Sequence, residues 1–240
     1  MDQLLTPKQV GQAIGVSESS LKRWCDQGRI NTIRTPGGHR RLPLADVLQF
    51  LRTQGMAPVE PEILGLPSNT GKSERILTRA DDQLFHSLVE GDEELARQIV
   101  FELYLASHRP AVILDQVMTP AFHRIGKEWE CGDVEVFRER HACQIGLRVL
   151  RELRSTLPTA PSDAPIAIGG TPEGDPYDLP TAMIELTLRD VGWNASSLGT
   201  RLPFPTLIEA VDRLNPQLLW ISVSHIDEAE EFVEEFERFS

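Results

Sequence analysis

The sequence has few cysteines and no long apolar run. Its 240 residues include three cysteines, and aromatic residues make up 6%. Cys25, Cys131 and Cys143 are odd in number and lack the short paired spacing of a zinc site, so we expect neither a disulfide framework nor a metal knuckle. No stretch approaches the ~18 consecutive apolar residues of a membrane span, and the first residues form no secretory signal. These absences predict a cytoplasmic protein with reduced thiols that meets no membrane.

The sequence also lacks the residue patterns of common catalytic sites. No Ser-His-Asp set, paired carboxylates or cluster of metal ligands stands out from the background. We therefore predict no catalytic residues, no metal site and no enzymatic activity.

Basic residues are scarce overall but concentrated at one end of the chain. The 24 Lys and Arg face 36 Asp and Glu, for a formal net charge of −12. Residues 1–55 hold eight of the basic and four of the acidic side chains, a net charge of +4, which leaves −16 for the rest. This asymmetry indicates that the first 55 residues meet a polyanion, whereas the acidic remainder would repel nucleic acid.

Two stretches rich in proline, glycine and serine, near residues 56–72 and 157–165, divide the chain. The fold class that we predict is multidomain, mainly α and then α/β. Its expected parts are a winged helix-turn-helix at 1–55, a linker at 56–72, a four-helix bundle at 73–157 and a partial Rossmann-like parallel sheet at 164–240.

The first unit has the signals of a helix-turn-helix with a wing. Thr6 followed by a proline and Ser17 after a glycine turn are typical helix starts. Residues 30–44 favour two strands joined by a tight turn, and residues 44–51 favour a third amphipathic helix. Two short helices separated by a tight turn can place the second helix in a DNA major groove.

The run from Ser17 to Gly28 and the segment RTPGGHRR at residues 34–41 are specific in residue type, order and spacing. Over residues 3–53 the chain resembles the DNA-binding domain of the MerR superfamily and the related excisionase-type winged helices. The resemblance implies a homodimer on a palindromic operator, with the second helix in the major groove and the wing on phosphates. The alternative is a solvated basic face on a small protein-binding domain. The candidate DNA-binding residues, which supply cations for phosphates and polar groups for base edges, are Ser17, Glu18, Ser19, Ser20, Lys22, Arg23, Arg34, Thr35, Gly38, His39, Arg40 and Arg41.

Residues 73–157 repeat apolar side chains at helical spacing and are broken by short turns. The pattern predicts four antiparallel helices with a kink at Pro120. The corner between the third and fourth helices resembles the bundle of light-responsive, cobalamin-binding MerR-type repressors and of corrinoid methyltransferase modules. In that family a Trp caps the upper face of the cofactor, and a Glu followed by a His lies ten residues further on.

Trp129 and Glu139 match this pattern, whereas two histidines of the family do not. Glu130 stands where the family has a His beside the Trp, and His141 comes one place late. The resemblance therefore implies a partial cofactor cap. The alternative for the same corner is a surface cluster of ion pairs of little energetic weight, formed by Glu128, Arg138, Glu139 and Arg140.

The tail alternates three strands, at 165–170, 194–198 and 218–224, with three helices, at 179–191, 205–214 and 227–239. Such alternation predicts a parallel sheet with right-handed crossovers. A complete five-stranded domain of this type needs roughly two further strand-helix units, so either the native chain is longer or the sheet is curtailed.

Ligands of parallel sheets bind at the carboxyl ends of the strands. The loop Glu173-Gly174-Asp175 there resembles the signature of cobalamin-binding domains, with Asp175 in place of the cobalt-ligating His. A carboxylate is a poor stand-in for imidazole on cobalt, so we predict that the fold is kept and the usual cobalt ligation is lost.

The function that we predict is a transcriptional regulator that binds operator DNA and whose C-terminal half forms a dimer or higher homo-oligomer and senses a signal without cobalamin. The alternatives are a cobalamin-dependent light-responsive repressor, a corrinoid methyl-transfer module, or an architectural factor that only bends DNA. Adenosylcobalamin, another tetrapyrrole or hydrophobic ligand, and a protein antagonist stay open as the signal. The candidate cofactor-binding residues are Trp129, Glu139, His141, Glu173, Asp175 and Ser224.

Overall fold

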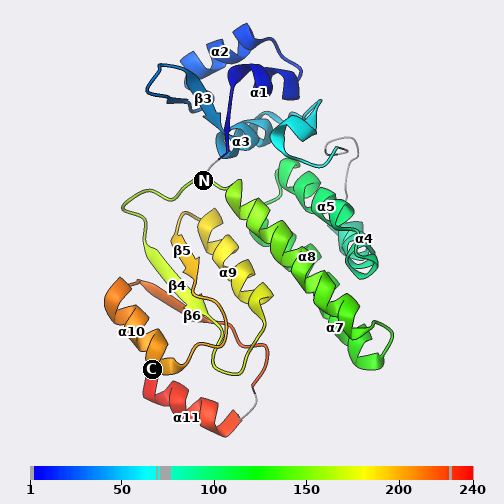
Figure 1. The fold of residues 1–240 in the computed structure, drawn as a ribbon, viewed down its shortest axis with the longest axis vertical. Helices are drawn as coiled ribbons and strands as arrows, with labels where there is room; N and C mark the ends of the chain where they lie inside the picture. The colour runs from blue at the N-terminus through cyan, green and yellow to red at the C-terminus, as the bar shows by residue number, and fades with distance from the viewer. Residues whose placement is uncertain (1–2, 69, 71–76, 227–228, 240) are drawn as a thin grey trace. The chain divides into compact units, whose positions relative to one another are not determined.

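A computed structural model describes residues 3–68, 70, 77–226 and 229–239. The chain divides into two compact units, Met1–Pro158 and Thr159–Ser240, which Figure 1 draws from blue to red. The predicted class, a mainly helical multidomain chain that ends in an α/β sheet, is confirmed. Among the described residues, no helix has the length and apolar character needed to cross a membrane.

Unit 1 begins with three helices and a small antiparallel sheet of order β1-β3-β2. The hairpin of β2 and β3 is the predicted wing, and β1 is a strand that the sequence did not predict. The elements in chain order are β1 (Leu4–Leu5), α1 (Pro7–Ala13), α2 (Glu18–Asp26), β2 (Ile33–Arg34), β3 (Arg40–Pro43) and α3 (Leu44–Gln54).

Both predicted helix starts in this domain are confirmed by their caps. The Thr6 hydroxyl accepts from the Gln9 backbone N–H at 3.2 Å, and the Gln9 side chain accepts from the Thr6 N–H at 2.9 Å, which forms a capping box. The Ser17 hydroxyl accepts from the Ser20 N–H at 3.2 Å. The turn between the two helices passes through Gly15, whose φ of 72° favours glycine.

The segment predicted as a linker is ordered where the structure describes it. Residues 56–68 pack on unit 1 and include the short helix η1 (Pro61–Leu64), with Leu64 fully buried. The backbone N–H groups of Val59 and Glu60 donate to the Ala13 carbonyl at 2.8 and 3.0 Å. Proline lowers the entropy that a chain loses when it is ordered, so a proline-rich segment also suits a packed one. The rest of the predicted linker, 69 and 71–72, and the predicted bundle start at 73–76 lie outside the described residues.

The helical bundle completes unit 1, and its third predicted helix is irregular. There a π-helical turn, η2, joins α6 to α7, and Pro120 is the second residue of α7. Proline has no N–H to donate and collides with the carbonyl of the preceding turn, and a π turn is one way to absorb that defect. A π turn thus stands just before Pro120, the residue at which the sequence predicts a kink. The elements are α4 (Leu77–Glu90), α5 (Glu93–Leu105), α6 (Pro110–Ile113), η2 (Leu114–Met118), α7 (Thr119–Cys131) and α8 (Val136–Ser155).

Unit 2 contains the predicted parallel sheet, with strand order β5-β4-β6 and both neighbours of β4 parallel to it. Figure 1 shows α9 on one side of the sheet and α10 with α11 on the other. The predicted helix start at 227–228 lies outside the described residues. The elements are β4 (Ile166–Gly170), α9 (Asp178–Asp190), β5 (Asn194–Ser197), α10 (Phe204–Leu214), β6 (Leu218–Ile221) and α11 (Ala229–Phe239).

A tryptophan fills the sheet face beneath α9. Trp220 of β6 packs with Ala167 and Ala195 and donates its indole N–H to the Thr181 hydroxyl of α9 at 2.9 Å. A Cβ added at Gly169 would lie 2.2 Å from the indole ring. The glycine therefore gives the indole room to lie across the neighbouring strand.

Candidate nucleic-acid interface

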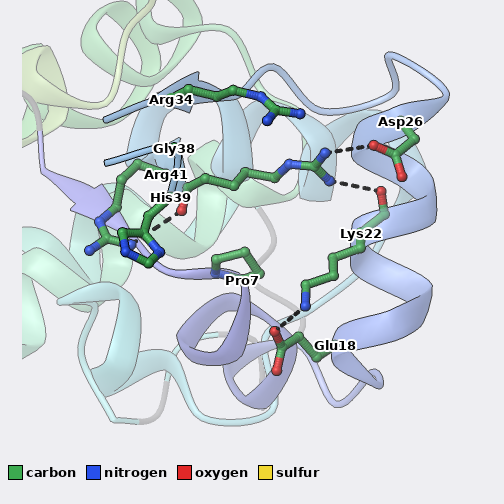
Figure 2. Close-up of a pocket in the computed structure, with 9 residues that line it drawn as sticks. Pro7, Glu18, Lys22, Asp26, Arg34, Gly38, His39 and Arg41 are labelled. Carbon is green, nitrogen blue, oxygen red and sulfur yellow. Dashed lines mark hydrogen bonds and ion pairs between the residues drawn. The ribbon is translucent and has the colours of Figure 1, made fainter. Parts of the chain in front are cut away.

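A groove of about 380 Å³ runs between α2 and the wing. Seven of its nine lining residues are among the predicted DNA-binding residues, and sequence reasoning missed Pro7 and Asp26. Figure 2 shows the side chains that converge from α1, α2 and the wing. The lining residues are Pro7, Glu18, Lys22, Asp26, Arg34, Gly38, His39, Arg40 and Arg41.

The wing tip is a tight turn closed by its own backbone. The Thr35 N–H donates to the His39 carbonyl at 2.9 Å, and the Gly38 N–H donates to the Thr35 carbonyl at 2.8 Å. The Thr35 hydroxyl accepts from the His39 N–H at 3.2 Å. Gly38 has a φ of 77°, which only glycine adopts without strain. Thr35 and Gly38 therefore shape the turn that carries the arginines.

The serines at the start of α2 are engaged locally. The Ser17 hydroxyl caps the helix and lies 2.9 Å from the hydroxyls of both Ser19 and Ser20. Ser19 and Arg23 are exposed on the same helix. These two side chains are free of the core and can face a groove of DNA.

The cations of the groove differ in how they are held. Lys22 pairs with Glu18 at 2.7 Å across one helical turn, with both side chains about half exposed. Arg34 is exposed on β2, and Arg41 donates to the Arg40 carbonyl at 3.2 Å. An exposed ion pair such as Lys22–Glu18 contributes little stability, so Lys22 can exchange it for phosphate at little cost. In the part of the chain that the structure describes, no ion pair ties Arg34 or Arg41 to an acidic side chain.

Arg40 is held within the domain. Its guanidinium donates to the Asp26 carboxylate at 2.6 Å and to the Lys22 carbonyl at 3.1 Å. The hydrogen bond to Asp26 raises the pKa of Arg40 above its ordinary value. Only 19% of the Arg40 side chain is exposed. Sequence reasoning treated all wing arginines alike, because a pair between residues 14 positions apart has no local signal.

The candidate residues of the bundle corner differ in their exposure and in their contacts. Trp129 is 38% exposed near the end of α7. The Glu139 side chain, 12% exposed, pairs with Arg140 at 3.3 Å and accepts from the Cys143 thiol at 3.3 Å. His141 is exposed on α8, and a Cβ at Gly91 would lie 3.2 Å from its ring. His141 thus packs on the turn between α4 and α5.

The predicted single cluster of ion pairs in this corner is divided. Glu128 pairs with Arg124 at 2.8 Å. Arg138 pairs instead with Glu135 at 3.0 Å and with Glu90 at 3.7 Å. Within the predicted cluster, Glu139 does pair with Arg140. Glu128 and Arg138 instead find partners one helical turn away, in Arg124 and Glu135, which the predicted cluster did not include.

Asp175 lies buried at the carboxyl end of the sheet, where it joins two loops. Its carboxylate accepts from the backbone N–H groups of Ser224 at 2.6 Å, Tyr177 at 2.9 Å and His225 at 3.2 Å. The Asp175 side chain is fully buried, whereas Glu173 is exposed. Asp175 and Ser224, both predicted as cofactor-binding residues, are thus joined by a bond from backbone to side chain, which fixes the two loops.

Within the described ranges, no group of three or more His, Cys, Asp or Glu side chains is arranged to hold a metal ion. The Cys143 thiol is poorly suited to one, because burial raises its pKa to about 12. A thiol binds metal as the thiolate.

Known families match both parts of unit 1. Residues 4–55 match the helix-turn-helix domain and residues 80–154 match the B12 binding domain. The chain joins a helix-turn-helix domain to a B12-binding-type domain. The chain is 26% identical over 238 residues to the HTH-type transcriptional repressor CarH of Myxococcus xanthus. The alignment covers 91% of this chain and 78% of that protein.

The chain is also similar to corrinoid proteins. It is 25% identical over 150 residues to the trimethylamine corrinoid protein of Methanosarcina barkeri, covering 61% of this chain and 67% of that protein. The solved structure of the Methanosarcina barkeri monomethylamine corrinoid protein aligns with a TM-score of 0.56 at 16% identity, over 68% of this chain and 78% of that one. This structural likeness shows a shared fold.

Proposed function

We propose that the protein is a transcriptional regulator that binds operator DNA through α2 and the wing and senses a signal through its remaining domains, without cobalt ligation from Asp175. The observation that carries the proposal is the groove in which cations from a helix and a wing converge. The helix-turn-helix match and the similarity to a transcriptional repressor support it. The regulator would act in the cytoplasm.

The groove suggests how DNA would be held. A B-DNA major groove is about 12 Å wide and admits one α-helix. With α2 inserted, the exposed side chains of Glu18, Ser19 and Arg23 would meet base edges, and Arg34 and Arg41 of the wing would meet the phosphates alongside. A homodimer would then read two half-sites about 34 Å apart.

Two features argue against a corrinoid ligated by the sheet. The oxygens of Asp175 already accept from three backbone N–H groups, so their lone pairs are engaged within the protein and are not directed at a ligand. Trp220 occupies the face of the sheet over Gly169. The residues at these positions therefore do not fit a cobalt ion ligated from below.

A second candidate function is a cobalamin-dependent regulator that holds the cofactor without a protein ligand. The match of residues 80–154 to the B12 binding domain and the similarity to corrinoid proteins favour it. Trp129, 38% exposed, offers an indole face on which a flat macrocycle could stack. A methyl-transfer module would use the same corner, but the helix-turn-helix match favours a regulator.

Selection from fragmented genomic DNA tests the proposal. Full-length protein should retain fragments that share an inverted repeat, and the Arg34→Ala/Arg41→Ala variant should retain far less. Lys127→Ala is the matched control, because Lys127 is an exposed cation on α7, outside the groove. Failure of the unmodified protein to retain any fragment, at low salt and with or without adenosylcobalamin, would contradict the proposed function.

A further inference from the structure

The wing and α2 are joined by one charged pair. Arg40 is the first residue of β3, and Asp26 is the last residue of α2. The Arg40 guanidinium donates to the Asp26 carboxylate and to the Lys22 carbonyl. Figure 2 draws these bonds as the dashed lines that end at the labelled Asp26 and Lys22. Because Lys22 and Asp26 are four residues apart on a helix, both acceptors lie on the face turned to the wing. A planar guanidinium spans such a pair of acceptors.

Asp26 is one of two carboxylates, with Glu18, in a groove that also gathers four cationic side chains, Lys22, Arg34, Arg40 and Arg41. Its side chain is 64% exposed there. A carboxylate at this place repels phosphate, so on charge alone it weakens any complex with a polyanion. The presence of Asp26 is explained if its pair with Arg40 favours DNA binding by more than the carboxylate's repulsion of phosphate weakens it.

At its base the wing is anchored through β3, where Leu42 and Pro43 pair with β1 and Leu42 is fully buried. The half of the hairpin nearer the tip has fewer contacts to fix its angle. The hairpin pairs over only two positions, Ile33 with Arg41 and Arg34 with Arg40. Ile33 is 51% exposed, so it adds little apolar packing. Arg34 and Arg40 are also direct cross-strand neighbours, and like charges in that position destabilise a hairpin. The Asp26 carboxylate offsets that repulsion and draws β3 toward α2.

We propose that Asp26 and Arg40 form a latch that sets the angle between the wing and α2, so that Arg34 and Arg41 meet phosphates while α2 lies in the major groove. Arg40 is then a positioning residue and not a phosphate contact. The inference rests on the proposed function, since it assigns roles within the same DNA interface.

The competing account has Arg40 leave Asp26 and bind a phosphate. The two accounts differ in the sign of one effect. If charge alone matters, Asp26→Asn removes a repulsive carboxylate and tightens binding to DNA. If the latch matters, the same change loosens the wing and weakens binding several-fold.

Fluorescence anisotropy with the full-length protein and a labelled duplex of random sequence measures these effects across a range of salt concentrations. The latch predicts that Asp26→Asn and Arg40→Gln each weaken binding about three- to tenfold, with an unchanged slope of log Kd against log salt. It also predicts that Arg40→Lys weakens binding as much as Arg40→Gln, because a lysine keeps the charge but not the fork, and that Asp26→Glu retains most of the affinity. The double variant Asp26→Asn/Arg40→Gln should be no weaker than either single one.

The matched control is Asp46→Asn. Asp46 accepts from the Asn31 side chain at 3.1 Å in the same domain but does not line the groove, so its replacement should change affinity little. Amide hydrogen exchange at residues 33–41 gives a second measurement without DNA, and the latch predicts faster exchange in Asp26→Asn.

Tighter DNA binding by Asp26→Asn overturns the latch. The latch is also overturned if Arg40→Gln lowers the slope of log Kd against log salt by about 0.9 while Arg40→Lys binds DNA normally, because Arg40 would then be a phosphate contact. Either result leaves the proposed function standing. An unmodified protein that binds no duplex even at low salt overturns the proposed function, and the latch with it.

Discussion

Replacing Asp175 by Ala should destabilise unit 2 strongly, because one buried carboxylate accepts three backbone N–H groups. A hydrogen bond to a charged group contributes about 1.5–3 kcal/mol. Three such bonds would sum to about 4.5–9 kcal/mol. The three donors lie in part-buried loops, where water can replace much of what is lost, so we expect a loss smaller than that sum, roughly 2–4 kcal/mol. For a domain of this size, each kcal/mol shifts the melting temperature by about 4–8 °C. The predicted fall is roughly 8–32 °C.

Thermal unfolding of the full chain, followed by circular dichroism, measures this shift. The transition of unit 1 is an internal reference, and Glu173→Ala is the matched control, since Glu173 is an exposed carboxylate in the same loop. A melting temperature for Asp175→Ala equal to that of the control would refute the structural role of the carboxylate. The sequence alone predicts that Asp175→His creates or strengthens cobalamin uptake, provided that the scaffold is otherwise competent. The buried hydrogen bonds instead predict that this variant loses stability before it gains a ligand.

Three further predictions concern the groove, the sheet and the thiols. Arg34→Ala should lower the slope of log Kd against log salt by about 0.9 per subunit in anisotropy titrations; an unchanged slope would remove this side chain from the DNA contacts. Gly169→Ala should lower the urea midpoint, because its Cβ would lie 2.2 Å from Trp220 and overpacking costs about 1–3 kcal/mol or more; an unchanged midpoint would contradict the packing. Cys143, whose pKa burial raises to about 12 from 9.0, should react with a thiol reagent at pH 8 far more slowly than the exposed Cys131. The folded state holds this proton more tightly than the unfolded state, so stability should fall as pH rises from about 9 toward 12; equal labelling rates or a flat profile would contradict it.

Most of the fold is predictable from short-range sequence patterns. The caps at Thr6 and Ser17 depend on neighbours within three residues, and the alternation of strands and helices in unit 2 sets a parallel sheet. Composition predicts a linker at the proline-rich segment 56–68 and misses its packing on unit 1, because that packing comes from residues such as Leu64, which is far from α1 in sequence. Composition reports the stiffness of such a segment but not what it packs against.

The candidate sites were predicted less completely, for a similar reason. From the sequence, Arg40 is indistinguishable from the other wing cations. Its hydrogen bond to Asp26, 14 residues earlier, is visible only in the folded structure. The sequence predicts Asp175 as a replaced cobalt ligand, because the loop resembles that of cobalamin-binding domains and Asp175 stands at the position of their His. Its actual partners, the N–H groups of Ser224 and His225, are 49 and 50 residues away. Hydrogen bonds from side chain to distant backbone leave no pattern in a single sequence.

The most direct test of the proposed regulator is one titration of a selected DNA fragment with the full-length protein, repeated with adenosylcobalamin in the dark and after illumination. We predict specific binding with the same Kd in all three conditions, because the interface is built from α2 and the wing and Asp175 is engaged by backbone. A fragment that binds only with cobalamin, or a Kd that changes on illumination, would contradict the cobalamin-independent account, and absence of specific binding would contradict the regulator itself.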